Sequence, residues 1–134
     1  MDDWQDRALT PGDWRYFAEP NETLAIFAAD PLSPDPQLVI VCNLEMRQIG
    51  IVRPSEAGVP VDMFIRTETA DRKLSATPFD GRQTVVVGKV AARDRLLDAM
   101  AFSNGRIAVL VAGQEPLVIP AWPEITRVVE DCRV

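Results

Sequence analysis

The feature that most limits how this chain can fold is the length of its apolar stretches, none of which exceeds a single β-strand. The longest, Leu38–Cys42 and Ile107–Ala112, are rich in β-branched residues, which pack well on a pleated surface. Short polar or Gly- and Pro-containing segments separate one stretch from the next. Strands joined in this way pair antiparallel, so the sequence predicts a mainly β fold. A helix that spans a membrane needs about 20 apolar residues in succession, so we expect no transmembrane segment.

We expect about eight short strands, with Leu38–Cys42 in the middle of a sheet because it is apolar on both of its faces. A polar turn is expected at Ala70–Lys73. The candidate strand segments are Asp13–Ala18, Thr23–Ala28, Gln37–Cys42, Met46–Val52, Val61–Thr69, Leu74–Phe79, Thr84–Val87 with Val90, Arg106–Ala112 and Leu117–Ile119.

Two segments have the pattern of helices. Asp94 is a candidate N-cap for a short helix over Arg95–Ser103. A second helix is expected to follow Trp122, since Pro123 suits the first helical position. Its apolar residues recur at helical spacing and form one stripe. The residues of this stripe are Ile125, Val128, Val129 and Cys132.

These elements predict an antiparallel β-sandwich or flattened barrel with one short internal helix and one C-terminal helix. Residues 13–134 are expected to form a single domain, and residues 1–12, which are acidic and end in Thr10-Pro11-Gly12, a flexible leader. A chain of 134 residues buries enough surface to fold without a metal ion. The sequence predicts no metal site and no cofactor.

The two cysteines are both expected to point into the interior. Cys42 shares a strand face with Leu38 and Ile40, and Cys132 lies on the apolar stripe of the last helix. Two alternatives follow, either a long-range disulfide or two buried free thiols. In the chain-entropy model, a bond that closes a loop of roughly 90 residues contributes on the order of 4 kcal/mol.

Catalytic motifs are scarce in this composition. The chain has no histidine, which excludes Ser-His-Asp triads, Cys-His pairs and His-ligated zinc. No glycine-rich phosphate loop is present, and a net charge of −6 gives no support for binding nucleic acid. We therefore expect a protein that is not an enzyme. An enzyme that uses carboxylates and arginines would need Asp62, Arg66 and Arg106 to converge in one cleft.

Four residues are candidates for recognition of a partner. Phe64 and Arg66 lie on the mostly polar face of the strand expected at Val61–Thr69, where an aromatic side chain is exposed. Trp14 and Tyr16 share one strand face, and they either line a binding groove or pack in the core.

The C-terminal third of the chain has a distinctive order of elements. Leu96–Phe102 leads through Gly105 into Arg106–Ala112, and Leu117–Pro120 then precedes the closing helix. This order resembles the exported bacterial proteins of the invasion-associated locus B family, over roughly residues 85–132. In that family a short helix, a β-hairpin and a C-terminal helix follow a β-rich core with disulfides, so the resemblance implies an exported domain.

The end of the chain is also similar to small uncharacterised bacterial cell-envelope proteins. These end in a Pro-Ala-Trp-Pro and Asp-Cys-Arg pattern, here Pro120–Pro123 and Asp131–Arg133. Neither resemblance implies a catalytic residue.

We therefore expect a non-enzymatic binding or structural module of the bacterial cell envelope. Its partner would be another protein or an envelope component, bound by a sheet face or an edge strand. One alternative is a small-molecule carrier with a ligand cavity inside the sheet. Another is a cytoplasmic adaptor, since Met1–Trp4 lacks the features of a signal peptide; a periplasmic or exported protein would have had its signal removed. The sequence leaves the oligomeric state open.

Overall fold

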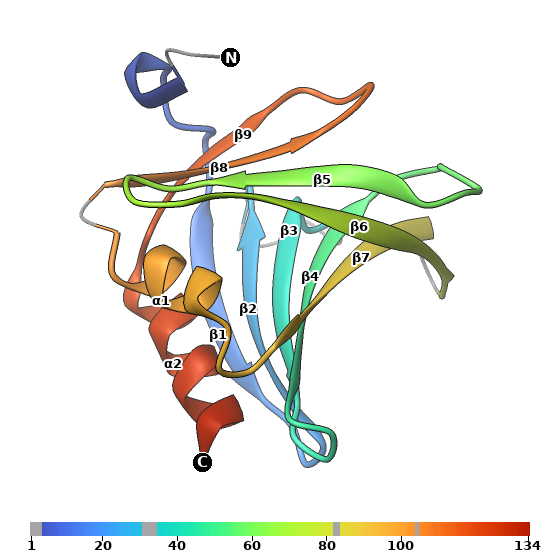
Figure 1. The fold of residues 1–134 in the computed structure, drawn as a ribbon, viewed down its shortest axis with the longest axis vertical. Coiled ribbons are helices and arrows are strands. Elements are labelled where there is room, and N and C mark those ends of the chain that lie inside the picture. The colour runs from blue at the N-terminus through green and yellow to red at the C-terminus, as the bar shows by residue number, and fades with distance from the viewer. Residues whose placement is uncertain (1–3, 31–34, 82–83, 104) are drawn as a thin grey trace.

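The computed structural model describes residues 4–30, 35–81, 84–103 and 105–134. Within these residues nine strands, two α-helices and a single turn of 3-10 helix at Trp4–Asp6 are formed (Figure 1). The strands are β1 Asp13–Ala18, β2 Glu22–Ala28, β3 Leu38–Asn43, β4 Gln48–Pro54, β5 Val61–Arg66, β6 Asp71–Asp80, β7 Thr84–Ala91, β8 Arg106–Val111 and β9 Leu117–Pro120, and the helices are α1 Arg95–Ala101 and α2 Pro123–Arg133.

All nine strands belong to one antiparallel sheet, in the order β1-β2-β3-β4-β7-β6-β5-β8-β9. The sheet is not closed into a barrel, and the mainly β, flattened sandwich that the sequence predicts is confirmed. In Figure 1, β5, β8 and β9 cross over the ends of β1–β4. The two halves therefore enclose one interior between them.

Strand β6 joins the two halves of the sheet. Its residues from Asp71 to Ala76 pair with β5, and those from Ala76 to Asp80 pair with β7. The polar turn predicted at Ala70–Lys73 is therefore misplaced. The turn forms three residues earlier, at Thr67–Ala70, where the Thr67 hydroxyl accepts hydrogen bonds from the N–H groups of Thr69 and Ala70 at 3.2 and 2.9 Å. The polar residues at the start of β6 resemble a turn in the sequence, although they belong to a strand that faces solvent.

The interior is filled by large apolar side chains from both halves of the sheet and from the helices. Trp14 packs edge-on against Phe27, with ring centroids 5.4 Å apart. The largest side chains with almost no exposed surface are Phe27, Leu38, Ile40, Ile49, Ile51, Met63, Ile65, Leu96, Leu97, Met100, Ile107 and Ile119. This packing gives no support to a ligand cavity inside the sheet.

The edge strands β1 and β9 approach each other through side chains and the segment before β1. The Trp14 indole donates a 2.9 Å hydrogen bond to the carbonyl oxygen of Pro120. Thr10 donates its backbone N–H to Val118 at 2.8 Å, and its hydroxyl accepts the Val118 N–H at 3.0 Å. Trp4 is buried against Ala108 and Val118. Residues 4–12 of the expected leader thus lie against the sheet, and residues 1–3 lie outside the described residues.

Helix α2 covers the side of the sandwich that the strands leave open. Its apolar stripe is buried, and the helix packs against β1, β2, β3, β4 and α1. Of the two alternatives for the cysteines, the structure has the disulfide: Cys42 and Cys132 are bonded, with their Cα atoms 5.7 Å apart. Both cysteines are at most 1% exposed. The last helix is therefore tied to a central strand from inside the core.

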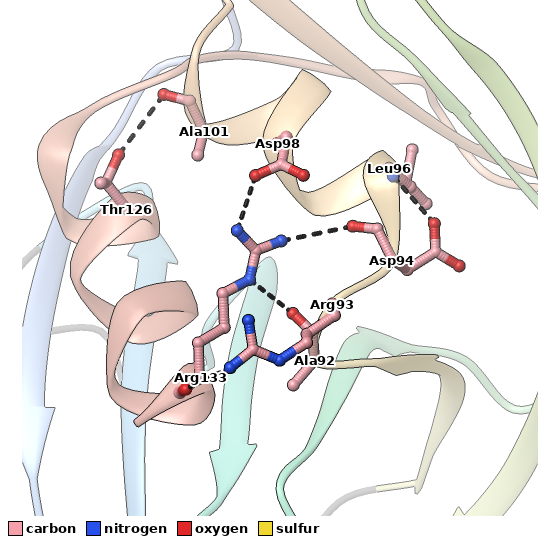
Figure 2. A network of polar contacts seen from close by, with 8 residues as sticks. All are labelled: Ala92, Arg93, Asp94, Leu96, Asp98, Ala101, Thr126 and Arg133. Atoms are coloured by element: carbon pink, nitrogen blue, oxygen red, sulfur yellow. Dashed lines mark hydrogen bonds and ion pairs between the residues drawn. The ribbon is translucent and has the colours of Figure 1, made fainter.

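Polar contacts hold the end of α2 against the segment that leads into α1 (Figure 2). The Arg133 guanidinium donates to the Ala92 carbonyl oxygen at 2.7 Å and to an Asp98 carboxylate oxygen at 2.6 Å. Arg93 in turn donates to the backbone oxygen of Arg133 at 2.9 Å. Cationic groups at a helix C-terminus are favourable because the last carbonyls carry partial negative charge.

The expected N-cap of α1 is present. The Asp94 carboxylate accepts the Leu96 N–H at 2.8 Å and pairs with both terminal nitrogens of Arg72 at 2.9 and 3.0 Å. The hydrogen bond from Arg72 and then that from Leu96 lower the pKa of Asp94.

Removal of the disulfide is expected to destabilise the fold. Because the bond closes a loop with a sequence separation of 90, the double substitution Cys42→Ala and Cys132→Ala should lower the free energy of unfolding by roughly 2–5 kcal/mol. Urea unfolding of the oxidised wild type and the double variant measures this difference. An equal unfolding midpoint for the two proteins would show that the bond adds no stability.

The Asp94 cap of α1 is expected to make the fold less stable at acidic pH than at neutral pH. Asp94→Ala is expected to cost roughly 1–2 kcal/mol at pH 7. Since the pKa of Asp94 is lowered by folding, its contribution is complete above the unfolded value and is lost as the pH falls below about 4. The stability difference between wild type and variant should therefore shrink on acidification. Glu130→Gln, at an exposed position on α2, serves as the control and should show no such convergence.

Candidate functional site

The structure separates the two aromatic residues predicted on β1. Trp14 is 3% exposed and belongs to the core. Tyr16 is half-buried at the margin between β1 and α2, where it lines a surface pocket with Trp122 and Arg127. Trp14 and Tyr16 therefore do not form one groove. Only Tyr16 reaches a surface that a partner can contact.

The Tyr16 ring is held in place by α2. Its hydroxyl donates a 2.5 Å hydrogen bond to an Asp131 carboxylate oxygen, and the Arg127 guanidinium carbon lies 3.9 Å from the ring centroid. Desolvation raises the pKa of the Tyr16 hydroxyl, and the Asp131 carboxylate raises it further. The phenol is therefore neutral at neutral pH and acts as a hydrogen-bond donor.

Phe64 and Arg66 both lie on the outer face of β5. Phe64 is 43% exposed, and its cross-strand neighbours are Lys73 and Leu110. An exposed aromatic ring at this position agrees with its expected accessibility, although the described residues form no deeper site around it.

The three residues of the enzyme alternative spread along the outer face of β5 and β8. Asp62 and Arg66 are four residues apart on one strand, which corresponds to about 13 Å, and Phe64 projects between them. Arg106 donates a hydrogen bond to the Arg7 carbonyl oxygen. The convergence that this alternative requires is not seen, so it gains no support.

The described residues hold neither a thiol nor an acidic cluster available for chemistry. Both cysteines are consumed by the disulfide. Among the residues that the structure describes, no group of three or more His, Cys, Asp or Glu side chains could hold a metal ion. Over the same residues no helix is long and apolar enough to cross a membrane.

The largest described hollow, which we call the outer groove, lies on the solvent side of the sheet. It has a volume of about 840 Å³ and follows the outward-facing residues of β3, β4, β6 and β7. Its apolar surface comes from Val39, Val41, Val52, Val85, Val87, Phe79 and the prolines Pro36, Pro54 and Pro78. Along a strand with one face in solvent, apolar residues that point inward normally alternate with polar residues that point outward. The concentration of valines on this outward face therefore needs an explanation.

Gly50, on β4, is buried beside the outer groove and is not part of its lining. This residue lies opposite Val41 on β3 and Lys89 on β7. A Cβ atom added to Gly50 would come within 3.2 Å of Cγ1 of both Val41 and Val87. The absence of a side chain on β4 therefore leaves room for Val41 and Val87, two residues of the groove lining, to pack over Gly50.

Few of the residues that line the outer groove are charged. The charged side chains in its lining are Glu22, Asp35 and Lys89, and Lys89 is the cross-strand neighbour of Gly50. Phe79, at the end of β6, is 61% exposed and forms part of the wall. A mainly apolar surface with a few charged groups is the arrangement found where proteins bind one another.

The outer groove was not predicted from the sequence, although the apolar pattern of one strand indicates it. Leu38–Cys42 is apolar on both faces, and this pattern was interpreted only as a sign of a central strand. β3 is central, but its outward residues Val39 and Val41 are only partly buried. In an antiparallel sheet, a strand that is apolar on both faces also indicates an apolar outer surface.

Comparison with known proteins finds no match: no family model, no curated protein and no solved structure is similar to this chain. The resemblance to the invasion-associated locus B family therefore stays an expectation. The functional argument depends on the geometry alone.

Proposed function

We propose that this protein is a non-enzymatic binding module of an oxidising compartment outside the cytoplasm, namely the bacterial cell envelope. Its outer groove binds an apolar segment of a partner protein. The observation that carries the proposal is the apolar surface that the outward-facing valines of β3, β4 and β7 form in the lining of this groove. Exposed apolar patches of this kind mark interaction sites, because leaving them in water is costly.

A protein segment suits the outer groove better than a small ligand held within the sheet does. The inner face is occupied by side chains such as Phe27, Ile40 and Ile51, which have no exposed surface. The groove is lined mainly by apolar side chains, with Glu22, Asp35 and Lys89 as its charged groups. A peptide can place apolar side chains on the floor and polar groups at the edges.

The disulfide supports the location outside the cytoplasm. A buried bond between Cys42 and Cys132 forms and persists in oxidising compartments, whereas cytosolic reductants keep most thiols reduced.

Selection of peptides on the folded protein tests the outer groove. Peptides enriched from a random displayed library are synthesised and titrated by calorimetry against wild type and Val87→Glu. We expect apolar peptides and a dissociation constant at least about tenfold higher for the variant, because a carboxylate on the floor must be desolvated when the peptide binds.

Val59→Glu is the matched control, since Val59 is exposed and lies outside the groove lining. The enriched peptides should bind Val59→Glu as tightly as they bind the wild type. Melting curves show whether each variant is folded. A selection without enrichment, or equal affinity of the enriched peptides for Val87→Glu, would refute the groove as the binding site.

The redox state of the protein in its native cell tests the compartment. Alkylation of the unfolded protein without reductant, followed by intact-mass measurement, should show no reacted thiol. If both cysteines are alkylated, the bond is absent in the cell, and the cytoplasmic adaptor becomes the better hypothesis.

A further inference from the structure

A second surface pocket, separate from the outer groove, lies where α2 begins beside β1. Tyr16, Trp122, Pro123, Glu124 and Arg127 line it, and its volume is about 540 Å³. It shares no lining residue with the outer groove. Its chemistry also differs, because it combines aromatic rings with two charged groups of opposite sign.

The indole of Trp122 is unusually accessible. Trp4 and Trp14 are 5% and 3% exposed, whereas Trp122 is 38% exposed. The carbonyl oxygen of Trp122 accepts the Ile125 N–H at 3.1 Å at the start of the helix, so its backbone is held. Among the described residues its indole N–H has no hydrogen-bond partner. An exposed indole ring with a free N–H donor, on a backbone that is held by the helix start, is thus presented to solvent.

The charged groups in this pocket are also free to bind. Within the part of the chain that the structure describes, neither the Glu124 carboxylate nor the Arg127 guanidinium makes a hydrogen bond or an ion pair. Arg127 instead lies over the Tyr16 ring, which is fixed by Asp131. The guanidinium group is planar, and its N–H donors point outward within that plane. When its flat face contacts an aromatic ring, these donors stay available for hydrogen bonds. The pocket therefore offers an acceptor and two kinds of donor beside an exposed ring.

We propose that this pocket binds a pyranose ring of a glycan. One face of a pyranose carries C–H groups that pack on an aromatic ring, and its hydroxyl groups both donate and accept hydrogen bonds. Trp122 provides the ring, Glu124 accepts, and Arg127 donates. A proline-rich peptide offers mainly carbonyl acceptors and would leave Glu124 without a partner. An anionic ligand would be repelled by Glu124 and by a net charge of −6.

Titration of the full chain with trisaccharides tests this proposal. N-acetylated chitotriose and cellotriose represent pyranoses with and without an acetamido group. Each is added to labelled protein while the Trp122 indole N–H is followed by NMR. We expect at least one of them to shift this signal with a dissociation constant of about 1 mM, as for a single open subsite. Which sugar binds distinguishes the two glycan classes.

Variants separate recognition from folding. Because Trp122→Ala lacks the indole signal, binding by the variants is followed through the backbone amide signals of Glu124 and Arg127, which line the same pocket. Trp122→Ala should weaken binding about tenfold, and Glu124→Gln should weaken it to a smaller extent because the charged acceptor is lost. Glu130→Gln, on the same helix but outside the pocket lining, and Val87→Glu should both bind as the wild type does. Absence of any shift up to tens of millimolar, or undiminished binding by a folded Trp122→Ala protein, would overturn the proposal. Either result leaves the outer groove unaffected.

Discussion

The bond between Cys42 and Cys132 is the constraint on which the rest of this structure depends. It joins the last turn of α2 to the inner face of β3, a strand in the middle of one half of the sheet. The sheet does not close on itself, so its interior needs a cover, and α2 supplies one with its apolar stripe. Arg133 then fixes the end of the helix to Ala92 and Asp98, and Asp131 fixes Tyr16. These contacts hold the C-terminal half of α2, and the hydrogen bond from Tyr16 to Asp131 joins β1, which carries Tyr16 of the pocket around Trp122, to the same helix.

The two faces of the sheet use the same residue types for different purposes. On β3, Leu38, Ile40 and Cys42 have no exposed surface, while the valines between them remain partly accessible. Burying an apolar side chain stabilises the fold because its surface is removed from water. A valine that stays partly exposed contributes only part of this free energy. The outer groove is therefore an apolar surface that would gain stabilisation if another molecule covered it. Gly50 contributes indirectly, because its missing side chain leaves room for Val41 and Val87 to pack over β4.

Much of the architecture could be predicted from sequence, because it depends on local periodicity. Alternation along the strands and the spacing of Ile125, Val128, Val129 and Cys132 set the elements and the inward direction of both cysteines. The order of the strands could not be predicted, since β7 inserts beside β4 and β6 divides its pairing between β5 and β7. The outer groove depends on that order: Val41, Gly50 and Val87 come from three strands. Trp14 and Tyr16 share a face, yet only the packing of Phe27 and α2 decides which one is buried.

The two surfaces differ in what they require from the fold. The outer groove is built almost wholly from hydrogen-bonded strands, whose register is set by ladders that do not involve α2. The pocket around Trp122 takes four of its five lining residues from α2 and the N-cap that precedes it. Local stability is not uniform in proteins, and elements that are docked by side chains open more easily than central strands do. The disulfide removes much of that difference, because it ties the docked helix to β3 at its far end. The covalent bond thus limits how far the helix that carries one surface can separate from the sheet that carries the other.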